Sequence, residues 1–321
     1  MNVSEIPLGM PPQLSEPGVL IILSIIAVVG MVANFANIYT TVKSPILHNA
    51  FGHLCASQSF AEVLNLLISC VWTVFVAVVD KKLATSVFGY KLGQTAFGVC
   101  LLVSYTVLLK AVNRFMAISH PFLVGNSKLI ILGTWILGFL HFCTGFFEGC
   151  NFLLNVQEFY WYFDETPCGQ ILAFYIDLSY SCFLMAIAVL LDSFTLFHLL
   201  KFHKTVRVTK NVDSRTRKLD IRFFAQSCLT TLVQVLMLVS FHVFSKFDAS
   251  PWAVFFTTTF AWAFCSAADG IVNFGFNFKY FKTRVVAGSG IVTTVPKSQI
   301  PSNHDRSGVV NASFTNFRPT V

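Results

Sequence analysis

Seven long apolar segments, separated by short polar stretches, dominate the pattern of this chain. They cover residues 19–42, 51–79, 92–117, 129–147, 171–200, 223–245 and 252–276. About 20 apolar residues in a helix span a hydrocarbon layer roughly 30 Å thick. Lipid offers no partner for free backbone groups, so each segment must be helical, and none shows the alternation of a membrane strand. The pattern predicts an all-α membrane protein, a seven-transmembrane helix bundle.

Composition supports this class of protein. Hydrophobic residues make up 55% of the 321 residues and charged residues only 12%, whereas soluble domains carry about 25% charged residues. All eleven prolines lie outside the seven segments, as expected for residues that interrupt helices. A soluble globular fold is therefore excluded.

The distribution of positive charge predicts the orientation. Residues 1–18 contain no Lys or Arg, whereas residues 201–222 contain eight, against two Asp. Because Lys and Arg concentrate on the cytoplasmic side, we expect the N-terminus outside and the C-terminus in the cytoplasm. The expected regions are an extracellular N-terminus (1–18), a seven-helix domain (19–282) and a polar, disordered cytoplasmic tail (283–321). The net charge of +7 then reflects topology, and a nucleic-acid partner is not expected.

Cysteines and glycosylation motifs follow the same division. Cys150 and Cys168 fall in the one long outer loop, where the surroundings are oxidising, so we expect them to form a disulfide. The sequon at Asn2 lies outside and is open to glycosylation, although its terminal position leaves its use undecided. The sequon at Asn311 lies inside and should stay unmodified.

Polar side chains within the apolar segments are costly in lipid and are therefore candidate functional residues. Glu62, Asp269, Asn34 and Asn273 are spaced as a buried cluster on facing helices, which can share protons, waters or a sodium ion. The alternative is a structural hydrogen-bond network. Structure or switching is favoured over transport, because the sequence shows no chain of acids for a proton path. No metal site and no other cofactor is expected.

Arg114 lies at the inner end of the third apolar segment, in Asn113-Arg114-Phe115. Taken alone it is an interfacial arginine of a kind common in membrane proteins. Lys110 lies one turn earlier, and we expect its side chain to reach toward the same interface.

Several short motifs occur in order along the chain. A G-x-x-x-N motif ends at Asn34, and Glu62 follows 28 residues later. Further motifs are Asn49-Ala50-Phe51-Gly52, Asn113-Arg114-Phe115, Gly149-Cys150, Thr166-Pro167-Cys168, Phe174-Tyr175-Ile176-Asp177, Leu191-Asp192, Phe223-Phe224-Ala225-Gln226 and Asp269-Gly270. This ordered set resembles that of G-protein-coupled receptors, and most closely that of the nematode serpentine chemoreceptors of class X, within the rhodopsin-like receptors.

The resemblance implies a chemosensory receptor in the plasma membrane, and by family in the ciliary membrane of sensory neurons. Its partners would be a small chemical ligand at the outer face, a heterotrimeric G protein and the lipid bilayer. The expected ligand pocket contains Cys100, Tyr105, Asp177 and Trp262, although Asp177 has the alternative of a capping or interhelical role. Coupling to the G protein is expected to involve Asn113, Arg114, Phe115, Lys218 and Arg222.

Several departures from the rhodopsin-like pattern affect the activation details. Asn113 replaces the acid that usually precedes the arginine, Gly270 stands where a proline is usual, and the sixth segment lacks a proline. The seventh segment contains no lysine for a retinal Schiff base, which argues against a light receptor. A receptor for an endogenous peptide or amine and a small transporter remain alternatives. No enzyme motif is present, so an enzyme is not expected.

Overall fold

The computed structural model describes residues 14–119, 127–206, 214–247 and 250–288. It contains seven helices that are long and apolar enough to cross a membrane, which confirms the predicted fold class. The side chain of Lys218 and the sequon at Asn2 lie outside the described part of the structure. The inside–outside orientation stays a prediction. The outer end of the bundle is the end expected to face out of the cell, and the inner end is the one expected to face the cytoplasm.

Each membrane span consists of one helix or of consecutive helical pieces. Spans 1 to 4 are α1 (Glu16–Lys43), α2–η2–α3 (Ala50–Leu66, Leu67–Trp72, Thr73–Val79), α4 (Val87–Ser119) and α5 (Ser127–Cys143). Spans 5 to 7 are α6–η6–α7 (Pro167–Ile171, Leu172–Tyr180, Ser181–Val206), α8 (Ser214–His242) and α9–η8–α10 (Pro251–Phe255, Phe256–Phe260, Ala261–Gly288). Short 3-10 turns connect some of them: η1 (Pro45–Leu47), η3 (Lys81–Thr85), η5 (Thr144–Phe146) and η7 (Phe244–Lys246).

The helices extend beyond the apolar segments because polar residues can continue a helix outside the hydrocarbon layer. Span 5 begins at Pro167, where the Thr166 side chain caps the helix by accepting a hydrogen bond from the Gly169 N–H. Proline suits a first turn, which needs no N–H donor. The last helix continues to Gly288, so six residues assigned to the tail are helical.

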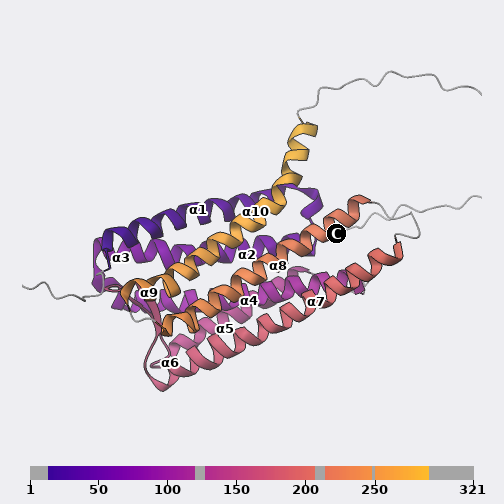
Figure 1. The fold of residues 1–321 in the computed structure, drawn as a ribbon. Coiled ribbons are helices and arrows are strands. Elements are labelled where there is room, and N and C mark those ends of the chain that lie inside the picture. Colours follow the sequence, from indigo (N-terminus) through magenta and orange to yellow (C-terminus); the bar gives the residue numbers. More distant parts are fainter. Residues whose placement is uncertain (1–13, 120–126, 207–213, 248–249, 289–321) are drawn as a thin grey trace, which may run out of the picture.

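Span 3 lies at the centre of the bundle. Its helix α4 contacts α2, α5, α7 and α8. In its apolar stretch of 18 residues, 72% of the residues are buried, a larger share than in any other span. Figure 1 shows α1 and α10 side by side along one flank and α7 on the opposite flank. The start of α1 and the end of α10 lie at opposite ends of the bundle. Side chains on α4 are therefore in the best position to connect the other spans.

A two-stranded antiparallel hairpin covers the outer end of the bundle. Strand β1 (Phe152–Asn155) pairs with β2 (Tyr160–Phe163). In the turn between them, Phe159 adopts a φ of 55°, which is uncommon for a residue with a side chain. The Phe159 side chain is 1% exposed and packs in one hydrophobic cluster with Val19, Leu23 and Phe255. Burial of this ring anchors the hairpin tip to the outer ends of spans 1 and 7.

Three spans contain π-helical segments in their outer halves. These are η2 in span 2, η6 in span 5 and η8 in span 7. A π-helix forms i→i+5 hydrogen bonds and occurs often at functional sites. All three segments lie on the side of the bundle that carries the hairpin, so the irregular backbone is concentrated where we expect the ligand.

Candidate functional site

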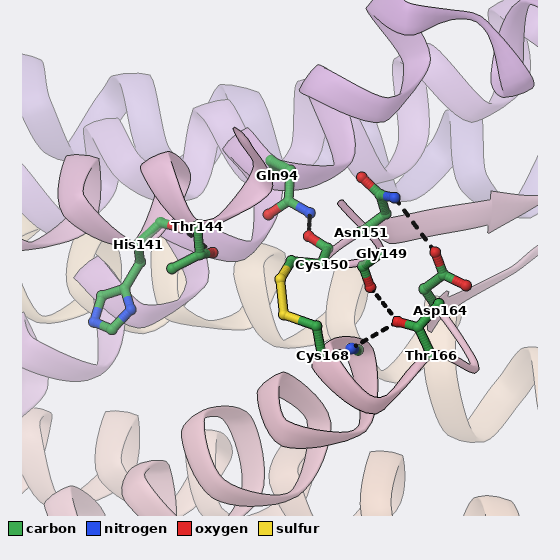
Figure 2. Close-up of a disulfide and its surroundings, with 10 residues drawn as sticks. Gln94, His141, Thr144, Gly149, Cys150, Asn151, Asp164, Thr166 and Cys168 are labelled. Carbon is green, nitrogen blue, oxygen red and sulfur yellow. Dashed lines mark hydrogen bonds between the residues drawn. A yellow bond between two sulfur atoms is a disulfide. The ribbon is translucent and has the colours of Figure 1, made fainter. Parts of the chain in front are cut away.

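A disulfide between Cys150 and Cys168 fixes the base of the hairpin, with the two Cα atoms 5.0 Å apart (Figure 2). The Gln94 side chain on α4 donates a hydrogen bond to the Cys150 carbonyl, and the Thr166 hydroxyl donates one to the Gly149 carbonyl. Gly149 has a φ of +74°, and a Cβ atom there would lie 2.8 Å from the Thr166 hydroxyl oxygen. Glycine is therefore required at this turn.

A small outer cavity lies beneath the hairpin, among spans 3, 5, 6 and 7. Its volume is about 30 Å³, and its lining consists of Phe97, Cys100, Phe152, Phe163, Asp177, Met237, Leu238, Phe241, His242 and Trp262. That volume holds one or two water molecules. The expected pocket residues Cys100, Asp177 and Trp262 do line it, and a larger ligand requires side chains to move.

A hydrogen-bonded contact in this lining joins two spans. His242 Nε2 on α8 lies 3.0 Å from Asp177 Oδ2 in span 5, and both side chains are largely buried. Asp177 thus has the interhelical role considered as an alternative and also faces the cavity. The sequence reasoning missed His242, because a histidine next to an apolar helix end gives no distinct signal.

Tyr105 lies outside the group of residues that line this cavity. Its hydroxyl forms a 2.7 Å hydrogen bond with His141 Nε2 in span 4, and its ring makes an edge contact with Tyr180. Tyr105 therefore connects spans 3, 4 and 5.

An open vestibule of about 430 Å³ lies beside the hairpin, between β2 and the outer ends of spans 5, 6 and 7. Phe163, Phe241 and His242 line both the vestibule and the outer cavity. These three side chains are the wall between the two spaces. The vestibule also contains Tyr162, whose pKa is raised above 10.0 by burial and by the nearby Tyr160 and Asp164, so its phenol remains a neutral hydrogen-bond donor.

A buried polar layer occupies the middle of the bundle. Glu62 and Asp269 are 1% and 0% exposed, and the Gln234 amide of span 6 donates to both, at 3.5 Å to Glu62 Oε1 and 3.1 Å to Asp269 Oδ2. Gln58 also donates to Asp269 Oδ2, at 2.8 Å. The structure thus brings the two expected acids together and adds two glutamines that sequence reasoning did not single out.

The two expected asparagines form hydrogen bonds next to this layer. Asn34 donates to the Gly30 and Ser266 carbonyls at 3.0 Å and 3.1 Å, which ties span 1 to span 7. Asn273 accepts a 2.8 Å hydrogen bond from Gln226 of span 6. The cluster therefore connects spans 1, 2, 6 and 7.

Lys110 does not reach the interface, so the expected position of its side chain is wrong. It is 0% exposed, and its ammonium donates a 3.2 Å hydrogen bond to the Thr230 hydroxyl in span 6. The helix α4 continues for nine residues beyond Lys110 to Ser119, roughly 13 Å along the axis, which is too far for the side chain to reach the interface.

Arg114 is paired at the inner end of the bundle. It donates a hydrogen bond to Asp192 in span 5, and both side chains are less than one-tenth exposed. The Cys228 thiol of span 6 lies 3.7 Å from the other Asp192 oxygen. The acid missing at position 113 is thus replaced by an acid from another span, a relationship that spacing along the sequence does not reveal.

Three other expected coupling residues are described by the structure. Asn113 and Phe115 are half-buried on α4. Arg222 on α8 donates to the Gly275 carbonyl at 3.3 Å and lies over the Phe276 ring.

A sodium ion was also expected in the polar layer, and this stays a prediction. Asp269 Oδ2 accepts two N–H donors from glutamines, whereas Asp269 Oδ1 is buried and has no hydrogen-bond partner among the described residues. Within the described part of the chain, no group of three or more His, Cys, Asp or Glu side chains is placed to hold a metal ion.

Comparisons with known proteins agree with this architecture, which is that of a seven-helix receptor. The structure of squid rhodopsin superimposes with a TM-score of 0.62 at 13% sequence identity, over 90% of this chain and 94% of that chain. This similarity shows the fold.

The sequence comparisons define the family. The family model "Serpentine type 7TM GPCR chemoreceptor Srx" matches residues 25–277. Serpentine receptor class X 45 of Caenorhabditis elegans is 23% identical over 280 residues, which cover 78% of this chain and 76% of that protein. The chain belongs to the Srx family of serpentine seven-transmembrane chemoreceptors, a family of multi-pass membrane receptors and not of enzymes.

Proposed function

We propose that this receptor binds a small, partly apolar ligand at its outer face and activates a heterotrimeric G protein at its inner face. The proposal includes the predicted orientation, with the N-terminus outside and the basic segment 201–222 in the cytosol. The plasma membrane of chemosensory neurons, and their cilia, is the proposed location.

The ligand would enter through the vestibule and expand the outer cavity. The shared wall of Phe163, Phe241 and His242 separates the two spaces, so it must move for a ligand to pass. Aromatic rings surround the hydrogen-bonded Asp177 and His242. Such a site favours a molecule with an apolar body and one polar group.

The observation that carries the proposal is that spans 5 and 6 are joined at both ends. Asp177 and His242 join them near the cavity, and Asp192 and Cys228 join them at the inner end, where Asp192 also holds Arg114. A ligand that favours a different arrangement of the outer contact therefore shifts the inner one through its differential affinity for the two states. Arg114 is buried, so it becomes available to a G protein only after the inner end opens.

A screen in cells tests this function. Cells that express the receptor and a promiscuous G protein are exposed to a panel of small volatile and water-soluble compounds, and second-messenger signals are recorded. A compound that activates should lose potency with Asp177→Asn and His242→Ala. The matched control is Cys182→Ser, a change at an exposed thiol in span 5, which should leave potency unchanged.

The coupling step needs its own variant. Arg114→Ala should abolish the signal, and the double variant Arg114→Ala/Asp192→Asn, which leaves no unpaired buried acid, should also be silent while it reaches the cell surface. A double variant that still signals would remove Arg114 from the coupling mechanism. Access of an added protease to residues 201–222 on intact cells would reverse the orientation and contradict the proposal.

A further inference from the structure

A groove between spans 2 and 4 opens at the inner end of the bundle. Its volume is about 450 Å³, and its lining consists of His53, Ala56, Ser57, Phe60, Lys128, Ile131 and Trp135. The first four residues belong to α2, which begins at Ala50, and the last three belong to α5, which begins at Ser127. The groove therefore starts near the membrane surface and runs into the bilayer.

Hydrogen bonds and a ring contact hold the two walls of the groove together. His53 Nδ1 lies 3.2 Å from the Ser127 hydroxyl oxygen. The Trp135 indole N–H donates a 3.0 Å hydrogen bond to the Ser57 hydroxyl. The ring centroids of Trp135 and Phe60 are 5.6 Å apart. The groove is thus a defined feature of the packing between α2 and α5.

Polarity changes along the groove. Lys128 is exposed in the first turn of α5, and Trp135 lies seven residues further, roughly 10 Å along the helix axis. The Phe60 ring next to Trp135 remains 48% exposed. A cationic group at the level of the lipid headgroups, followed by an aromatic floor, matches the two parts of a phospholipid.

The charge of this region discriminates among phospholipids. Residues 43–61 and 115–147, which include both walls of the groove, contain two lysines and no Asp or Glu. An anionic headgroup is attracted to such a region, and a zwitterionic headgroup gains less. Basic pockets between membrane helices on the cytoplasmic side bind anionic headgroups, and the cytoplasmic leaflet is the one that carries anionic lipids.

We propose that this groove is a binding site for one anionic phospholipid of the inner leaflet. Its headgroup contacts Lys128, and an acyl chain packs against Trp135 and Phe60. The choice of leaflet rests on the orientation in the proposed function, whereas the groove and its charge do not. A lipid in this position contacts both walls and stabilises the packing of α2 against α5.

Fluorescence quenching in symmetric nanodiscs tests the site independently of orientation and of signalling. The full-length receptor is placed in phosphatidylcholine nanodiscs with an equal small fraction of acyl-brominated phosphatidylserine or acyl-brominated phosphatidylcholine. Bromine quenches tryptophans that it contacts, so Trp135 reports an acyl chain in the groove. Occupancy by the brominated phosphatidylserine should be about fivefold higher, the gain from one lysine near an anionic group. Trp135→Phe should remove the difference between the two lipids.

Variants of the lysine identify the headgroup contact. Lys128→Gln should abolish the preference for phosphatidylserine, and Lys128→Arg should retain it. The matched control is Lys82→Gln, which removes an exposed lysine at the outer end and should leave the preference unchanged.

Two outcomes would overturn the proposal. Equal quenching of the wild type by the two lipids would mean that ordinary bilayer lipid or a second receptor copy covers the groove. A preference that survives Lys128→Gln would place the anionic lipid elsewhere. A reversed orientation would contradict the proposed function and leave the quenching result unchanged, so the two failures are distinguishable.

Discussion

Arg114 of span 3 donates a hydrogen bond to Asp192 of span 5, and this pair is buried at the inner end of the bundle. Rhodopsin-like receptors usually place an acid directly before this arginine, and here that position is Asn113. The arginine is nevertheless held, by a helix that also contributes Asp177 to the outer cavity. The contact that holds Arg114 therefore depends on the position of span 5.

Removal of the Asp192 charge should release Arg114. We expect Asp192→Asn to raise ligand-independent signalling several-fold, because a neutral amide holds a guanidinium less strongly than a carboxylate does. Basal second-messenger level per receptor at the cell surface is the measurement. Ser193→Ala changes an exposed neighbour on the same helix and should leave the basal level unchanged; equal basal signals in the two variants would rule out a restraining role for Asp192.

The disulfide should contribute substantially to the stability of the outer face. Cys150 and Cys168 are 18 residues apart in sequence, and closing a loop of this length stabilises a fold by roughly 3 kcal/mol. Cys150→Ser/Cys168→Ser should lower the unfolding midpoint of the purified receptor by several degrees, and a reductant should do the same to the wild type. Cys182→Ser serves as the control, since Cys182 is free and exposed.

The contact between α4 and the hairpin leaves no room for a methyl group. A Cβ atom at Gly93 would lie 1.9 Å from the Phe152 carbonyl oxygen, so Gly93→Ala should push β1 away and destabilise the receptor. Gly133 on α5 has open space around it, and Gly133→Ala should be neutral or slightly stabilising, as expected for alanine in a helix. Midpoints of thermal unfolding compare the two; a tolerated Gly93→Ala would mean that the hairpin does not rest on α4.

The ring of Phe159 should hold the hairpin tip in place. Phe159→Ala removes a buried side chain and is expected to cost about 3–5 kcal/mol locally, which should increase hydrogen exchange of the hairpin amides. Phe88→Ala truncates a ring that is 63% exposed and should leave exchange unchanged. Unaltered protection in Phe159→Ala would show that the ring does not hold the hairpin tip.

Hydropathy was sufficient to predict the spans, since apolar length directly measures what a bilayer requires. It did not predict the hairpin, because two four-residue strands within one loop leave little periodic signal. It also missed the extension of α10 to Gly288, where polar residues continue the helix beyond the apolar segment.

The sequence predicted those site residues that are individually unusual in a membrane. It missed those whose role depends on a partner in another span. Acids in lipid are rare, so Glu62 and Asp269 were found, whereas Gln58 and Gln234 did not stand out among neutral polar residues. The position of Lys110 was predicted wrongly, because the lysine was taken to lie close to the inner interface, whereas α4 continues for nine residues beyond it to Ser119. The partner of Arg114 lies on another span, and sequence distance carries no information on that contact.

The π-helical segments of spans 2, 5 and 7 have a consequence for how such receptors diversify. Each wider turn rotates everything beyond it around the helix axis, relative to a regular α-helix of the same length. Loss or gain of one residue there would present a different set of side chains to the outer cavity, while the inner contacts of Arg114 and Lys110 keep their register. Related receptors can thus change what they detect without rebuilding how they respond.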